Sequence, residues 1–302
     1  MSEIIRAASN TFTTDLQMNL MKLNGRQFQL MAQISSGQRV AVASDDPAAA
    51  ARAIGYQSLQ RDLTQYQKNA QRAENVLNMS VNAIQSLKST VSRAQEIATV
   101  TQSGVSTRNY TDYAKEVNQL LEQAVSSSNS EYLDDPLFAG TATSASPFST
   151  TRDSNGKITA VTYVGNSGSA SFSISENAMV DPHTGGAENN KMLTAINNIL
   201  NLRDALESSN TTAVTSSQTA LITSENDIVD SLSTMGAKLM RVQTAKSQNS
   251  ASYQNLDKSI SGDVDADMSQ TILELNKIQT AYTAAMQGAA RVMSESLMNY
   301  IR

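Results

Sequence analysis

The chain has 302 residues, including one histidine, four prolines and no cysteine or tryptophan, and only 5% of its residues are aromatic. The absence of cysteine excludes disulfides, thiolate metal sites and thiol nucleophiles. Because large aromatic side chains are scarce, we expect an elongated helical shape rather than a thick globular core. The formal net charge is 23 − 28 = −5, and no segment gathers the Lys and Arg that bind a phosphate backbone. We therefore expect no nucleic-acid partner.

The first part of the chain predicts three helices. Apolar residues recur from Leu16 to Ile34 at the three-and-four spacing of one helix face, and Ser35-Ser36-Gly37 ends this pattern. A much longer pattern of the same period covers residues 59–94, and a third covers residues 113–124. The middle pattern is longer than an ordinary globular helix, which favours a rod-like arrangement.

Residues 132–189 differ in composition from these helical parts. Three of the four prolines, three of the five phenylalanines and six of the thirteen glycines lie there, which indicates a small β-rich module. A turn at 153–156 leads into a β-favouring run at 157–164, and a turn at 166–168 leads into residues 170–174, where apolar residues alternate with serine. We predict that these two runs pair as a hairpin with one buried face.

The helical pattern resumes at Asn190, continues to Ile260, and is followed by a turn at Gly262-Asp263 and a last helix. The sequence therefore predicts a mainly α chain with a small β-rich insertion. Both termini form an elongated helical hairpin or coiled-coil bundle, from whose middle the β module projects. The expected segments are an N-terminal coiled-coil helix, the first half of a helical rod domain, the β-rich insertion, the second half of the rod and a C-terminal coiled-coil helix: 1–34, 35–131, 132–189, 190–262 and 263–302.

Motifs of catalysis and ligand binding are missing from the sequence. His183 is the only histidine, it stands in a loop-like segment, and no nucleophile elbow, phosphate-binding loop or dinucleotide fingerprint accompanies it. Asp263, Asp265 and Asp267 alternate as in part of a calcium loop, but no glycine follows at the sixth position, so we expect them to cap the last helix. We predict no enzyme activity, no catalytic residue, no cofactor and no metal.

Since the chain shows neither a signal-peptide core nor an apolar run of about 18 residues, we expect no membrane insertion.

Three segments resemble one known family. The stretch 35–53 is similar to the N-terminal signature that bacterial flagellins share with flagellar hook-associated protein 3, in which a Ser-Ser-Gly turn precedes a basic residue and an Asp-Asp helix start. Residues 132–141 resemble the family's entry into its variable domain, and residues 290–301 resemble its closing helix. The residues of this chain that carry the signature are Ser35, Ser36, Gly37, Arg39, Asp45, Asp46 and Pro47.

The resemblance implies a structural axial subunit of the bacterial flagellum. Such proteins leave the cell unfolded through the flagellar type III export apparatus, with the help of a cytoplasmic chaperone, and polymerise outside the cell into a tube. Proline at position 47 and the ending 297–301 look more like hook-associated protein 3, the hook–filament junction protein, than like flagellin. The implied partners are other copies of the chain, hook-associated protein 1 and flagellin.

The resemblance also gives the terminal stripes a partner. In this family the two terminal helices form the inner layer of the tube, so we expect one stripe to pair with the other and neighbouring subunits to complete their burial. The expected interface residues are Leu16, Leu20, Leu23, Leu30 and Ile34 in the first helix and Ile272, Leu275, Tyr282, Met286 and Met293 in the last.

Three alternatives remain open at this point. Flagellin, the main filament subunit of bacterial motility, shares the same motifs. A cytoplasmic coiled-coil scaffold would share the helical stripes but has no need of a β insertion. A hydrolase would have to use carboxylates of the insertion together with the single histidine, namely Asp134, Asp135 and His183.

Overall fold

The computed structural model describes residues 2–102, 109–142, 146–168 and 170–300, and it describes side chains between residues 14 and 291 of these ranges. The described part is mainly helical, with short strand pairs in the middle of the chain, which confirms the predicted fold class. Its helices are α1 (Ser2–Ser36), α2 (Pro47–Gln102), α3 (Tyr110–Ser128), α4 (Gly186–Glu207), α5 (Thr211–Val264) and α6 (Met268–Tyr300).

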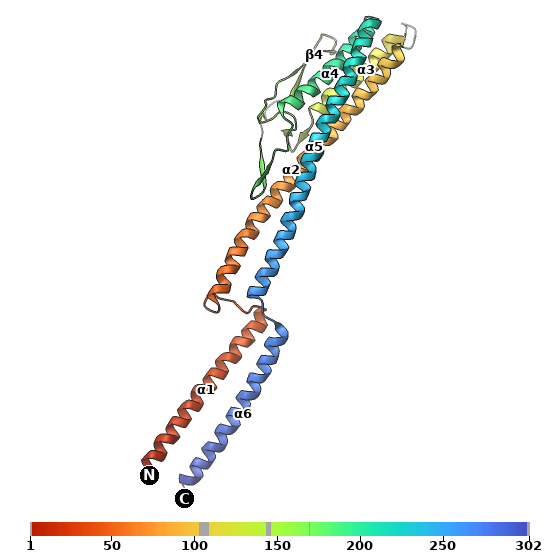
Figure 1. Cartoon of the computed structure of the whole chain (residues 1–302). Helices are drawn as coiled ribbons and strands as arrows, with labels where there is room; N and C mark the ends of the chain where they lie inside the picture. Colours follow the sequence, from red (N-terminus) through yellow and green to blue (C-terminus); the bar gives the residue numbers. More distant parts are fainter. Residues whose placement is uncertain (1, 103–108, 143–145, 169, 301–302) are drawn as a thin grey trace. The chain divides into compact units, whose positions relative to one another are not determined.

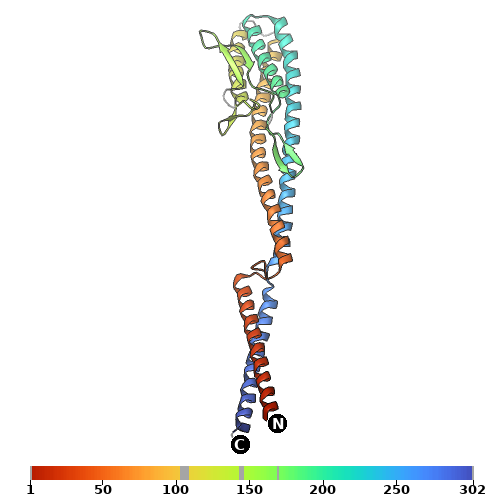
Figure 2. The same cartoon turned by 90° about the vertical axis from the view of Figure 1, so that its left-hand side faces the viewer.

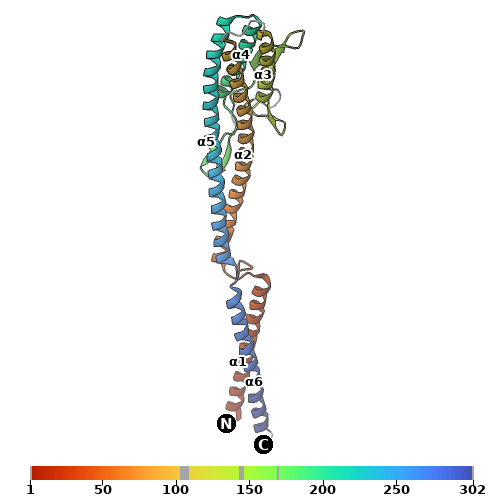
Figure 3. The same cartoon turned by 90° about the vertical axis from the view of Figure 1, so that its right-hand side faces the viewer.

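The chain divides into two compact units. Unit 1 comprises Met1–Arg61 and Tyr253–Arg302, and unit 2 comprises Asp62–Ser252. In unit 1, α1 and α6 pack side by side and run in opposite directions (Figure 2 and Figure 3). Unit 1 is therefore built by segments from the two ends of the chain.

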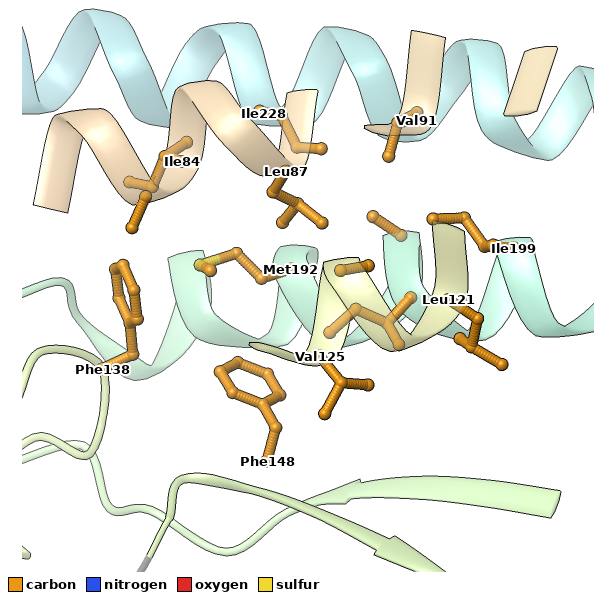
Figure 4. Packing of buried hydrophobic residues seen from close by; sticks show 14 of the residues in the cluster. Ile84, Leu87, Val91, Leu121, Val125, Phe138, Phe148, Met192, Ile199 and Ile228 are labelled. Atoms are coloured by element: carbon orange, nitrogen blue, oxygen red, sulfur yellow. The ribbon is translucent and has the colours of Figure 1, made fainter. Parts of the chain in front are cut away.

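The core of the protein lies in unit 2, where α2, α3, α4 and α5 lie together with the strands along one flank (Figure 1). The apolar stripe of α2 is buried there at Leu77, Ile84 and Val91, each seven residues from the next. Phe138 and Phe148 point from the strand region into the helical core, as Figure 4 shows, and both are fully buried. The few aromatic residues of the insertion thus anchor it on the helices.

Three separate antiparallel strand pairs form the β module. They are β1 (Glu131–Tyr132) with β2 (Asp135–Pro136), β3 (Phe148–Arg152) with β4 (Ile158–Tyr163), and β5 (Phe172–Ser175) with β6 (Ala178–Val180). The turn at 153–156 is present, but it joins β3 to β4, and the predicted pairing of 157–164 with 170–174 is wrong. Asn166 explains the difference, because its side chain binds the Thr141 amide and hydroxyl and so ties the 164–168 loop to residues before β3.

Asparagine side chains replace missing neighbour strands at the open edges of these pairs. Asn129, after α3, accepts a hydrogen bond from the Phe148 amide and donates one to the Phe148 carbonyl, both at 2.9 Å. Asn69 on α2 and Asn249 on α5 donate to the β5 carbonyls of Ser173 and Ile174 at 2.9 and 2.8 Å. The β3–β4 and β5–β6 pairs are therefore fastened to the helical part, since two-stranded sheets are marginally stable alone.

Among the helices of the described residues, we find none that combines the length and the apolar character required to span a bilayer.

Candidate functional site

The signature residues form the connection between α1 and α2, inside unit 1. Gly37 follows the last residue of α1 and has a φ of +73°, a conformation that glycine adopts without a Cβ penalty. Its amide donates to the Gln33 carbonyl at 2.8 Å, and the Ser36 hydroxyl accepts a bond from the Gln38 amide at 3.1 Å. This chemistry ends the helix at the position that the Ser-Ser-Gly motif predicts.

The break between α5 and α6 lies directly against this connection. The amides of Arg39 and Val40 both donate to the Val264 carbonyl, at 2.7 and 3.2 Å. In return the Ala266 amide donates to the Gly37 carbonyl at 2.9 Å, and Gln38 forms an antiparallel bridge with Asp265. Backbone hydrogen bonds therefore pair the two interruptions of the helices with each other.

The two adjacent aspartates have separate roles in the connection. The Asp45 carboxylate accepts hydrogen bonds from the amides of Ala41 and Val42, both at 3.1 Å, and so closes the turn before α2. Asp46 accepts one from the Ala49 amide at 3.1 Å and is the N-cap of α2, whose first residue is Pro47. This bond, followed by that from Arg39, holds the pKa of Asp46 below its usual value.

Two arginines, one in the α1–α2 connection and one near the start of α2, bind the end of α5. Arg39 binds the Asp46 carboxylate at 3.2 Å and the Asp263 carbonyl at 2.6 Å. Arg52 binds the Asp263 carboxylate through two nitrogens at 3.0 and 2.6 Å, a bidentate geometry. These hydrogen bonds keep the pKa of Asp263 below its usual value. We call Arg39, Asp46, Arg52 and Asp263 the arginine clamp.

Sequence reasoning missed the partner of Arg52. It assigned all three of the alternating aspartates to the cap of the last helix, but only Asp267 has that role, accepting a bond from the Gln270 amide at 3.1 Å. Asp265 instead accepts a bond from Ser261 at 2.5 Å, and Asp263 belongs to the arginine clamp. Arg52 and Asp263 are more than two hundred positions apart, so no local spacing of residues in the sequence predicts that they pair.

The first predicted stripe lies on one face of α1. Leu30 is fully buried, and Leu16, Leu20, Leu23 and Ile34 are partly buried. Because α6 is the helix that packs along α1, it covers this face. Arg26 pairs with Glu274 of α6 at 2.8 Å beside the contact.

The predicted residues of α6 differ in burial. Leu275 and Tyr282 are partly buried, whereas Ile272 and Met286 have 45% and 48% of their surface exposed. Met293 lies outside the residues whose side chains are described. The more buried face of α6 follows a three-and-four spacing through Thr271, Leu275, Ile278, Tyr282, Ala285 and Ala289.

A second apolar stripe runs along α1 on the side opposite its contact with α6. At about 100° per residue, Met18, Met21, Gly25, Phe28 and Ala32 point about 160° away from the buried face. We call these five residues the outer stripe. Met21 and Phe28 are 63% and 66% exposed. Such exposure is unusual for large apolar side chains gathered on one helix face, so the outer stripe is a candidate interaction surface.

The carboxylates considered for catalysis show no catalytic arrangement. Asp135 and His183 both line a mostly apolar cavity of about 220 Å³ in unit 2. Asp135 is 3.8 Å from Arg72, and His183 Nδ1 is 3.5 Å from Asp181. Asp134 does not line this cavity. Over the described ranges, no three His, Cys, Asp or Glu side chains come together in a way that would hold a metal ion.

Comparison with known proteins identifies the relatives of this fold. Residues 8–143 match the family model described as the bacterial flagellin N-terminal helical region. The search of curated proteins gives no significant match. The resemblance that the sequence motifs indicate is confirmed by the family model together with the solved structures that share the fold.

The matches to three of those solved structures extend over nearly the full length of the matched chains. A protein assigned as flagellar hook-associated from Vibrio parahaemolyticus is 18% identical and matches 73% of this chain and 100% of its own, with a TM-score of 0.64. FlgL of Bacillus cereus is 18% identical over 68% of this chain and 99% of its own, with a TM-score of 0.60. The flagellar junction protein FlgL of Legionella pneumophila is 13% identical over 71% of this chain and 100% of its own, with a TM-score of 0.52.

Proposed function

From the flagellin helical region that this chain carries, we propose that it is a structural axial subunit of the bacterial flagellum, and specifically the hook–filament junction protein. The fold that it shares with flagellar junction proteins supports this role. The observation that carries the proposal is the outer stripe of α1, which stays exposed although α1 is already packed on α6. We assign the chain no catalytic activity.

A second copy of the chain, or a related axial subunit, is the partner that the outer stripe requires. Burying one Met or Phe side chain stabilises a contact by about 1.5–3 kcal/mol. Met18, Met21 and Phe28 together offset only part of the entropy cost of association. The remainder is supplied by exposed apolar residues of α6, such as Ile272 and Met286, which we propose face other neighbours in a tube.

The proposed partners and location follow from this role. They are other copies of the chain, hook-associated protein 1 and flagellin in the extracellular flagellum, and an export chaperone with the type III export apparatus before that. The predicted interface residues on α1 and α6 remain part of the proposal. The division into an assembly helix at each end, two rod segments and an insertion also remains a proposal.

Flagellin is the second candidate, because the matching family model describes the N-terminal region of flagellin. Copy number separates the two roles. A junction protein is present in a few copies per filament, whereas flagellin is the bulk protein of purified flagella. Quantitative mass spectrometry of purified flagella therefore decides between them. If the chain were a cytoplasmic scaffold, it would be absent from purified flagella.

Phe28→Glu tests the proposed assembly surface. The substitution places a charge within the outer stripe, where a neighbouring subunit would have to bury it, so we expect the chain to be made but not incorporated into flagella. Asn24→Glu, at an exposed polar position of the same helix, is the matched control and is expected to be incorporated. Immunoblots of purified flagella and of the culture medium measure the outcome. Equal incorporation of the two variants contradicts the proposal.

A further inference from the structure

The described methionines of this chain differ in exposure. Met192 and Met235 in the core of unit 2 are 1% exposed. In unit 1, every methionine whose side chain the structure describes is exposed, over a range of 40% to 63%. These five residues are Met18, Met21, Met31, Met268 and Met286. We call them the unit 1 methionines.

We propose that the unit 1 methionines are a reversible oxidation site through which a hydroperoxide blocks assembly of the free chain. The inference rests on the proposed function, since it takes the surface of α1 and α6 to be the assembly surface. The chain contains no cysteine and no tryptophan. Exposed thioethers are therefore the side chains of this protein that a mild two-electron oxidant attacks first.

The chemical step transfers one oxygen atom. The thioether sulfur attacks the outer oxygen of the hydroperoxide, the O–O bond breaks and an S–O bond forms. The sulfur loses two electrons and becomes a sulfoxide. The peroxide is reduced to an alcohol, or to water when hydrogen peroxide is the oxidant, because the leaving oxygen takes up the proton that the transferred oxygen carried. Methionine sulfoxide reductases reverse the change at the expense of a thiol reductant.

The position of two of these residues gives the oxidation its effect. Met18 and Met21 belong to the outer stripe and precede Phe28 on the same face of α1. A sulfoxide oxygen is a strong hydrogen-bond acceptor, and the backbone amides of a helix interior already bind carbonyls four residues earlier. An apolar partner surface would leave that oxygen without a donor. Burial of an unpaired acceptor is costly, so each sulfoxide in the contact lowers the association constant by about tenfold or more.

Assembly then determines when the oxidant acts. In the free chain these sulfur atoms are open to solvent, and in the assembled chain the neighbouring subunit covers them. Oxidation is therefore fast before assembly and slow after it. The free subunit is the sensitive form.

The test uses the full chain and hydrogen peroxide. Peptide mass spectrometry measures sulfoxide at each methionine, and sedimentation velocity measures self-association before and after oxidation. We expect sulfoxide at Met18 and Met21, none at Met192 and Met235, and an unchanged far-ultraviolet circular dichroism spectrum. The association constant is expected to fall by about tenfold or more. Treatment with methionine sulfoxide reductases restores the association.

Leucine variants supply the matched controls, because Leu replaces Met with little change of volume. A variant with Leu at all five unit 1 methionines is expected to associate normally and to keep its association in peroxide. A variant with Leu at the exposed methionines of unit 2, which are Met79, Met179 and Met240, is expected to stay sensitive. Sulfoxide at Met18 and Met21 with undiminished association overturns the inference alone. Failure of the unoxidised chain to associate overturns the proposed self-association and the inference together.

Discussion

At the residue scale, the arginine clamp explains why the signature motif needs its charged residues. Arg39 lies in the α1–α2 connection and Arg52 near the start of α2, and both bind Asp263 at the end of α5, one through its carbonyl and the other through its carboxylate. Asp46 caps α2 and also accepts a hydrogen bond from Arg39. The four side chains thus join two interruptions of the chain that are more than two hundred residues apart in sequence.

The clamp predicts a loss of stability in acid. The pKa of Asp263 is lowered, first by the hydrogen bonds from Arg52, and that of Asp46 is lowered, first by the Ala49 amide. A carboxylate whose pKa is lower in the folded state stabilises the fold above its unfolded pKa of about 3.9. This contribution is lost as the pH falls through the lowered pKa. We expect the melting temperature of unit 1 to fall as the pH drops below about 4.

The variant Asp263→Asn tests whether the Asp263 carboxylate causes this loss of stability in acid. It keeps the shape of the side chain but removes the charge that Arg52 binds, so its melting temperature at neutral pH should be lower and should depend less on pH. Thermal melts followed by circular dichroism at several pH values measure both effects. Asp257→Asn, at an exposed position of the same helix, should keep the pH dependence of the parent. An unchanged pH dependence in Asp263→Asn would assign the acid sensitivity to other carboxylates.

At the element scale, helices supply what the short strand pairs lack. Each pair has two open edges, and side-chain amides of Asn69, Asn129 and Asn249 bind strand backbone groups there. Arg203 on α4 acts in the same way with a charged group. It is 1% exposed and donates to the Ile158 carbonyl of β4 at 2.6 Å, while Asp204 accepts two of its bonds. The module is held by these polar bonds as well as by its buried phenylalanines.

Asn129→Ala tests this attachment of β3. The substitution removes two hydrogen bonds and leaves the amide and carbonyl of Phe148 without their partner beside a buried ring. We expect a loss of about 1–3 kcal/mol in the free energy of unfolding. Urea denaturation measures it. Asn82→Ala, at an exposed position of α2, is the control and should change stability by less than about 0.5 kcal/mol. Equal stability of the two variants would mean that water replaces the Asn129 amide without cost.

At the scale of the whole molecule, local signals predicted more than long-range ones. The end of α1 at Gly37 and the start of α2 at Pro47 follow from turn and cap chemistry within a few residues. The strand pairing was predicted wrongly, because it depends on Asn166 and Asn129, which bind segments far from them in sequence. The partner of Asp263 was missed for the same reason. Apolar spacing predicted the stripe of α1, but it gave no sign of the outer stripe, since an exposed and a buried stripe have the same period.

The distribution of buried residues predicts that the two units differ in local stability. The continuous apolar core contains residues from Ala70 to Ala245 and lies wholly in unit 2. Among its described side chains, unit 1 buries few apolar residues completely, and Leu30 is the largest of them. Helices with little buried surface open at a low free-energy cost. In the isolated chain we therefore expect the amides of α1 and α6 to exchange with deuterium faster than those of α3 and α4.

Hydrogen exchange followed by mass spectrometry checks this difference, and assembly provides the second measurement. If neighbouring subunits cover the outer stripe, the amides around Phe28 should become protected in purified flagella by at least about tenfold, because opening α1 then requires loss of the subunit contact as well. The amides of α3 and α4 should change less, since their core is complete in the single chain. Protection of α1 in the monomer equal to that of α4 would show that its contact with α6 is sufficient, and the outer stripe would then have no part in the stability of the helix.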